Sequence, residues 1–178
     1  MNHMDIGSTY LDSIRSRFAS VKDLGGRALA QVNDRDLVWR SNDETNSIAV
    51  IVQHLHGNML SRWTDFLTSD GEKPDRERDG EFIEPKSPDR EGLIQMWEEG
   101  WGCMEKALAA LRPEDLLHEV IIRSQSLTAL DAVNRQLSHY AYHVGQIVHI
   151  ARERCGKNWR TLSIARGKSG SYPSSDKN

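Results

Sequence analysis

The chain has 178 residues and a mass of 20.2 kDa, a length that fits one domain whose core needs no disulfide in order to fold. Its 23 basic and 26 acidic residues give a formal net charge of −3, which makes no electrostatic case for nucleic acid binding. Hydrophobic residues are 38% of the chain, as in globular proteins, and no apolar run approaches the ~20 residues that a membrane helix needs.

The two cysteines, Cys103 and Cys155, lie far apart in the sequence and form no C-x-x-C pair. This usage favours a reducing compartment over a disulfide scaffold. The first ten residues lack a basic region followed by an apolar stretch, so we expect no signal peptide. The sequence therefore predicts a cytoplasmic protein.

The first predicted helix begins at a hydroxyl cap, Ser8 or Thr9, and runs to about Ala30. Its apolar residues recur at steps of three and four, the period of one helix face, and are Leu11, Ile14, Phe18 and Val21. A polar stretch over residues 31–46 separates this helix from the next one.

The second predicted helix begins at Asn46 or Ser47 and reaches about Thr68, with Phe66 on its apolar face. A long polar loop over residues 69–86 follows. Within this loop, the longest charge run of the chain, residues 72–81, mixes both signs and is interpreted as a solvated segment.

The third predicted helix begins at Ser87 and Pro88, because a hydroxyl cap followed by proline at the first helical position is a strong start signal. Arg112 and Pro113 end it. Its apolar residues keep three-four spacing over about five turns and are Ile94, Trp97, Trp101, Met104, Leu108 and Leu111. The stripe is most simply buried core.

Residues 119–123 could form a short strand, but no second strand-like run is available to pair with them, so we predict a connection. The fourth helix then begins at Ser126 or Thr128 and ends near Cys155, with Gly156 as its C-terminal cap.

Four long amphipathic helices predict an all-α protein, and a four-helix bundle is their natural packing. We expect one domain over residues 1–169 and a disordered tail over residues 170–178. Trp159, Leu162 and Ile164 could hold the segment before this tail against the helices.

Two of the seven histidines, His139 and His143, stand four residues apart on the fourth helix. They project about 40° apart, so both rings can reach one ion at about 2.0–2.1 Å. His149 is rotated about 120° from His143 and cannot join them. Such a pair also arises by chance, and two rim histidines hydrogen-bonded to neighbours are the alternative. Tyr140 follows His139, so the glutamate of an H-E-x-x-H peptidase is missing.

A third ligand would have to come from another helix, and His54 and His56 on the second helix are the candidates. They project about 160° apart, so only one can point at the site. The helical wheel does not choose between them.

Two segments resemble the DinB/YfiT-like family, and more narrowly an uncharacterised branch of that superfamily. They are I-V-Q-H-L-H-G-N over residues 51–58 and N-R-Q-L-S-H-Y-A-Y-H-V-G-Q-I over residues 134–147. The segment 159–169 resembles the same branch. The resemblance implies a four-helix bundle with a histidine triad between the second and fourth helices, which maps onto His54, His139 and His143. It also implies a homodimer.

The implied cofactor is a divalent metal ion, with zinc or nickel expected and iron possible, because imidazole suits all three. Three protein ligands leave a position open, the arrangement of catalytic zinc. Similar proteins include transferases and isomerases that use a low-molecular-weight thiol, so we expect S-transferase-type chemistry. A metal-dependent hydrolase is one alternative, although no carboxylate stands at motif spacing as a base. A non-catalytic metal-binding protein of stress response or assembly is the other.

Three further side chains are candidates for supporting the site. Gln146 lies on the ligand side of its helix and could orient bound solvent or a ligand. Arg135 flanks the same side and could hold an anionic group, and Asn58 lies one turn beyond His54. Ordinary hydrogen bonding at the helix rim is the alternative role for all three.

Overall fold

The structure is a computed structural model that describes residues 5–87 and 89–171; Pro88 and residues 172–178, most of the expected disordered tail, lie outside the described residues. The described part is mostly helical and carries one small two-stranded sheet. Its elements are α1 (Ile6–Leu29), α2 (Asp34–Leu37), α3 (Ile48–Trp63), η1 (Gly80–Phe82), α4 (Arg90–Ala110), η2 (Pro113–Leu117), β1 (Glu119–Ile122), β2 (Gln125–Thr128), α5 (Ala129–Cys155), η3 (Gly156–Asn158) and η4 (Ser169–Ser171).

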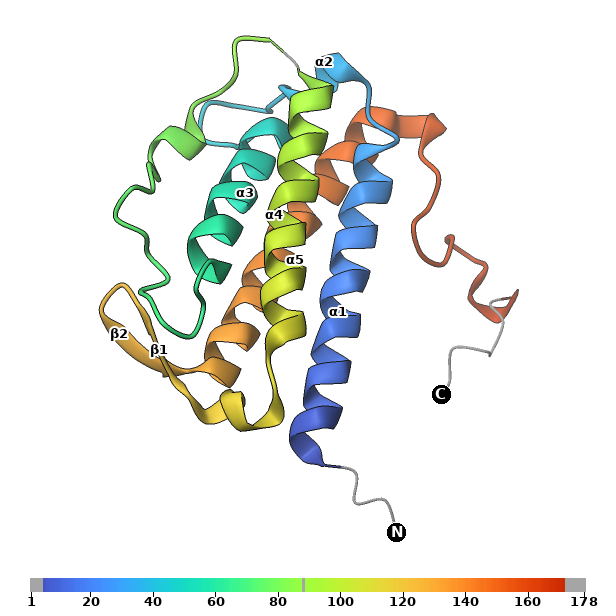
Figure 1. Cartoon of the computed structure of the whole chain (residues 1–178). Coiled ribbons are helices and arrows are strands. Elements are labelled where there is room, and N and C mark those ends of the chain that lie inside the picture. The colour runs from blue at the N-terminus through green and yellow to red at the C-terminus, as the bar shows by residue number, and fades with distance from the viewer. Residues whose placement is uncertain (1–4, 88, 172–178) are drawn as a thin grey trace.

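The four long helices lie side by side, with α3 against α4 and α1 against α5 (Figure 1). The hairpin of β1 and β2 lies at one end, next to the start of α5, and the loop between α3 and α4 runs along the outer side of α3. No helix in the described residues is long and apolar enough to cross a membrane.

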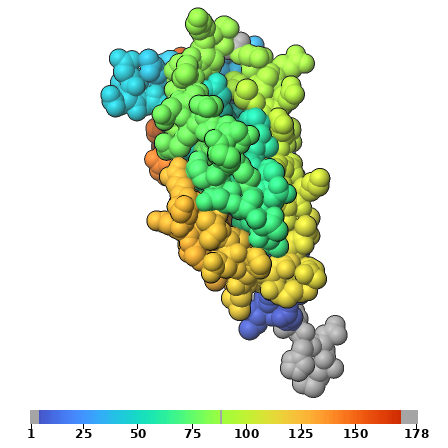
Figure 2. Space-filling view, turned by 60° about the vertical axis from the view of Figure 1, so that its left-hand side comes forward, coloured from blue at the N-terminus to red at the C-terminus, as the bar shows by residue number. Residues whose placement is uncertain are grey.

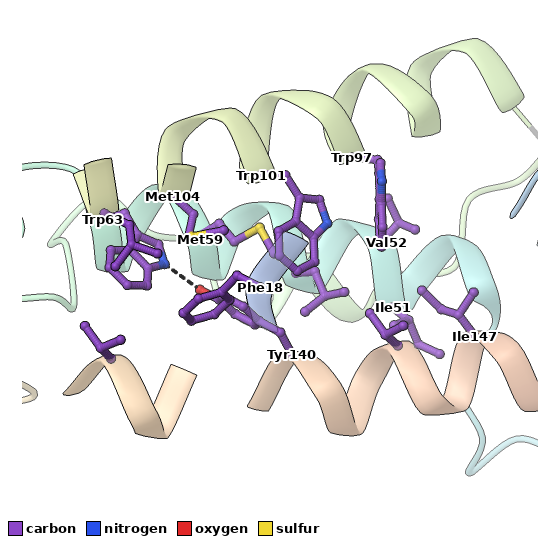
Figure 3. Close-up of a cluster of buried hydrophobic side chains, with 14 of the residues drawn as sticks. Phe18, Ile51, Val52, Met59, Trp63, Trp97, Trp101, Met104, Tyr140 and Ile147 are labelled. Atoms are coloured by element: carbon purple, nitrogen blue, oxygen red, sulfur yellow. Dashed lines mark hydrogen bonds between the residues drawn. The ribbon is translucent and has the colours of Figure 1, made fainter. Parts of the chain in front are cut away.

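One aromatic side chain from each long helix meets in the centre of the core (Figure 3). Phe18, Trp63, Trp101 and Tyr140 are each at most 2% exposed. The Trp63 Nε1–H donates to the Tyr140 hydroxyl at 2.9 Å, and the rings of Trp101 and Tyr140 lie 5.6 Å apart at 70°. This cluster joins α3, α4 and α5 and thereby fixes the face that each helix turns inward.

For two helices, one of the two predicted start residues is the cap that the structure shows. Ser47 caps α3 and Thr128 caps α5, and Gly156 ends α5 with a φ of 51°. The predicted caps of α1 and α4 are wrong, because Asp5 and Asp89 occupy those positions. A carboxylate next to a helix N-terminus gains from the helix dipole as well as from the hydrogen bond.

The predicted extension of α3 to Thr68 is wrong, because the helix ends at Trp63. Asp65 takes a left-handed φ of 50°, which turns the chain out of the helix. Phe66 nevertheless packs on Trp63 with ring centroids 4.9 Å apart and is 9% exposed. A buried apolar residue just beyond the helix therefore continued the apolar spacing from which the longer helix was predicted.

One short helix was not predicted, and one smaller prediction fails. The polar stretch 31–46 contains the short helix α2, whose Asp36 is buried and accepts from the Arg154 guanidinium at 2.8 Å. Ile94 was predicted on the core face of α4 but is 38% exposed.

Residues 119–122 form a strand and not a connection, which corrects the prediction of an all-α fold to a mostly helical fold with one small sheet. β1 pairs with β2 in antiparallel register, with Val120 opposite Leu127. The two turn residues, Arg123 and Ser124, both have positive φ, as a two-residue hairpin turn requires, but neither is the glycine or asparagine that usually signals it. The Asp70 carboxylate accepts both of their backbone N–H groups, at 2.9 and 3.0 Å.

The predicted anchoring of the C-terminal segment is seen in part. Trp159 and Leu162 pack against the core, whereas Ile164 is 43% exposed. The Gln31 side chain also bonds both backbone groups of Arg160, at 2.7 and 3.1 Å.

Candidate metal centre

The structure brings together three imidazole rings from two helices. His54 lies on α3, and His139 and His143 lie one turn apart on α5. One ring nitrogen from each residue falls within a group in which all atoms lie within 4.8 Å of one another. His54 is 5% exposed and His143 is 8% exposed, and His139 is half-buried, so the group lies mostly below the protein surface.

His54 is held from both sides by the short helix η1. Its Nδ1 lies 2.9 Å from Glu81 Oε2, and its ring packs against Phe82 with centroids 4.8 Å apart. Burial raises the pKa of Glu81. Hydrogen bonds from His54 and Arg76 outweigh this effect and hold the pKa below its usual value. An ionised carboxylate only accepts, so Nδ1 carries a proton, and in the neutral ring this tautomer has its lone pair on Nε2.

His143 is oriented in the same way by its own helix. Its Nδ1 lies 3.0 Å from Gln146 Oε1, an acceptor, so Nδ1–H donates and Nε2 is free. Burial, and then the neighbouring His54 ring, lower the pKa of His143 to about 4. Its imidazole is therefore neutral at pH 7, the form that binds metal.

His139 completes the group from the turn before His143. Its Nε2 lies 3.2 Å from His54 Nε2. Burial, and then the His143 and His54 rings, lower the pKa of His139 to about 3. Two nitrogens bound at about 2.1 Å to a tetrahedral ion lie about 3.4 Å apart, so this spacing fits a shared zinc-sized ion.

The charge run 72–81 is only in part the solvated segment that the sequence predicted: Asp75, Glu77 and Arg78 are exposed, but two charged side chains turn inward. The side chains of Arg76 and Glu81 are only 4% and 9% exposed. Arg76 grips Glu81 with two bonds of 2.7 and 2.8 Å and reaches Glu72 at 3.3 Å. A Cβ at Gly57 would collide with the Glu81 carboxylate, so glycine on α3 leaves the space in which Glu81 approaches His54.

The remaining histidines of the described residues point elsewhere. His56 Nε2 lies 3.1 Å from Glu99 on α4. His118 Nε2 lies 3.1 Å from the carbonyl of Leu67. His149 lines a separate hollow between α5 and the segment 39–46. The structure thus identifies His54, and not His56, as the histidine of α3 that joins the group. The helical wheel could not make this choice.

The three supporting candidates have different surroundings. Asn58 and Arg135 both line the cavity that the triad faces, which has a volume of about 300 Å³. Asn58 is 5% exposed, and its Oδ1 accepts from the Tyr140 hydroxyl at 3.2 Å. Gln146 does not line this cavity and instead bonds His143, so it orients a ring rather than a ligand.

Sequence reasoning missed two residues of the site. Glu81 lies 27 positions from His54, so no short motif links the two residues. Only the buried ion pair of Glu81 with Arg76, seen in the structure, shows that the segment folds inward. Gln136 lies one turn before Tyr140 on α5, lines the same cavity and is 3% exposed. Its place on the buried side of α5, beside Val133, was the available signal.

The comparisons with known proteins give one match, to a family of proteins. The sequence model of a family described as a protein of unknown function (DUF1572) matches residues 5–168. This range includes the triad, the η1 segment and the hairpin. No curated protein matches the chain.

Proposed function

The chain belongs to the DUF1572 family of proteins of unknown function, and on that premise we propose that His54, His139 and His143 hold one divalent metal ion. The observation that carries the proposal is the convergence of three imidazole nitrogens within 4.8 Å, two of them from buried residues. The four long helices, with residues 1–169 as one domain, are proposed as a four-helix bundle of the DinB-like kind, as the sequence resemblance implies.

Zinc or nickel is the proposed ion, with iron as a further possibility, since neutral imidazoles suit each of them. Three protein ligands would leave a coordination position open towards the cavity. When bound there, the ion would act as a Lewis acid that lowers the pKa of a coordinated thiol or water. Glu81 and Gln146 would each hold one ligand ring in the orientation and tautomer that binding requires.

We propose that the protein is a metal-dependent enzyme of S-transferase type that uses a low-molecular-weight thiol. The cavity beside the triad has room for a small substrate, and the amide of Asn58 and the guanidinium of Arg135 line it. Because Asn58 Oδ1 is occupied by Tyr140, its NH₂ group remains available to position a ligand. The cytoplasmic location and the homodimer that the sequence analysis expects remain predictions. Native mass spectrometry would test the oligomeric state.

The test of this activity is thiol consumption by zinc- or nickel-loaded protein with glutathione or bacillithiol and a panel of electrophiles. We expect turnover in the wild type and a fall of at least about 100-fold in His143→Ala, which lacks a ligand to the Lewis acid. His149→Ala, altered on the same helix but outside the triad cavity, should keep the wild-type rate. Equal rates in all three proteins would rule out catalysis at the triad.

Replacing Glu81 with glutamine is expected to weaken metal binding by about 10- to 100-fold, the usual effect of losing an outer partner of a ligating histidine. Glutamine keeps the size of the side chain but removes the charge that fixes His54 and pairs with Arg76. Competition for zinc against a chelator of known affinity measures the change. Glu77→Gln, on the exposed side of the same segment, serves as the control and should bind as the wild type does.

A further inference from the structure

The cavity in front of the triad is unusually rich in arginine. Five guanidinium groups line it, those of Arg62, Arg76, Arg78, Arg123 and Arg135, whereas no aspartate or glutamate of the described residues does. They come from α3, the loop after it, the hairpin turn and α5. In Figure 2 that loop (green) and the hairpin with the start of α5 (orange) lie side by side on one face. Separate segments therefore direct positive charge at one small space.

Three of these arginines have a structural role that explains them. Glu72 accepts from Arg62 at 2.9 Å and from Arg123 at 2.8 Å, and Arg76 binds Glu81. Burial raises the pKa of Glu72. The hydrogen bonds from Arg123 and Arg62 outweigh this effect and lower the pKa to about 2. Glu72 is therefore ionised at pH 7 and ties the loop to α3 and the hairpin.

The other two arginines have no such explanation. Arg78 and Arg135 form no ion pair within the described part of the chain, and both are exposed to solvent. Arg78 lies over the Phe82 ring, 5.5 Å from its centroid, and the Phe82 ring in turn packs on His54. Two carboxylates thus face five guanidinium groups, which leaves a net positive charge around the cavity.

A buried amide beside the triad also lacks partners. Gln136 is 3% exposed and lines the cavity, yet its Oε1 is buried without a hydrogen-bond partner in the described residues. A buried polar group without a partner costs about 1–3 kcal/mol, so its presence calls for an explanation. Asn58 lines the same space, and its Oδ1 already accepts from the Tyr140 hydroxyl. Both residues therefore line the cavity and bring an amide group to its wall.

We infer that the cavity binds a small organic molecule that bears an oxyanion group, a carboxylate or a phosphate, paired by Arg78 and Arg135 while Gln136 and Asn58 bond its polar part. The inference rests on the proposed function and names the class of substrate that the triad acts upon. Guanidinium groups match both oxyanions because their N–H donors bind two oxygens at once. A cavity of about 300 Å³ lies at the small end of ligand sites and restricts the molecule to a compact one.

Isothermal titration calorimetry with three probes tests the inference on zinc-loaded protein. Glutarate supplies carboxylates, inorganic phosphate supplies the other oxyanion, and uncharged glutaramide is the matched control. We expect the better of the two anions to bind at least about tenfold more tightly than glutaramide. The double variant Arg78→Gln/Arg135→Gln should lose at least about tenfold in affinity, since each charge-assisted hydrogen bond contributes substantially.

Two comparisons separate this inference from the proposed metal site. Arg152→Gln, an exposed position of α5 outside the cavity, should bind the anion as the wild type does. The double arginine variant should keep its zinc, while His143→Ala should lose zinc and still bind the anion more tightly than glutaramide. The inference would be overturned if the double variant bound the anion as tightly as the wild type does, or if the wild type bound neither anion more tightly than glutaramide. Neither result would contradict the metal proposal.

Discussion

His143→Ala is expected to purify with almost no bound metal, while the wild-type chain carries about one ion. The reason is that His143 supplies one of three nitrogens, and its Nε2 is free because Nδ1 bonds Gln146. Loss of an outer partner alone weakens metal binding by about 10- to 100-fold, so loss of a ligand itself should exceed about 100-fold. Elemental analysis of protein purified without a metal-affinity column measures the ion content directly.

Matched histidine variants make this result specific. His54→Ala and His139→Ala should also lose the ion, because each contributes one nitrogen to the same group. His56→Ala should keep it, since that ring faces Glu99 on α4 at 3.1 Å. Metal loss from the His56 variant together with retention in the His54 variant would show that the ligand assignment is wrong.

Trp101→Ala is expected to lower the free energy of unfolding by about 3–5 kcal/mol, the usual range for a fully buried tryptophan. Trp101 is 0% exposed and contacts the rings of Trp97 and Tyr140, at centroid distances of 5.4 and 5.6 Å. Its removal would leave a cavity where α4 meets α5. Urea denaturation followed by circular dichroism gives the change.

Ile94→Ala provides the comparison for this effect on the same helix. Ile94 is 38% exposed, so its truncation should cost well under half of the Trp101 effect. Similar losses in the two variants would contradict the assignment of Trp101 to the core. The triad should still bind metal in folded Trp101→Ala protein, because Trp101 does not line the cavity of the site.

The sequence by itself determined those features that depend on neighbours within a few residues. Periodic apolar residues identified four long helices, and local capping preferences identified Gly156 and narrowed two N-terminal caps to pairs that include Ser47 and Thr128. The four-residue spacing of His139 and His143 placed their rings on one side of α5, because the helix repeats every 3.6 residues. Each of these conclusions needs only the geometry of one helix.

Only the tertiary structure decided what faces the triad. His54 and His56 are equivalent on an isolated helix, and the packing of α3 against both α4 and α5 turns the first towards His139 and the second towards Glu99. Glu81 and Arg76 come from the loop between α3 and α4, and Arg123 comes from a hairpin turn that lacks the usual residues. Their positions depend on ion pairs between segments distant in sequence, and such contacts leave no periodic signal in the chain.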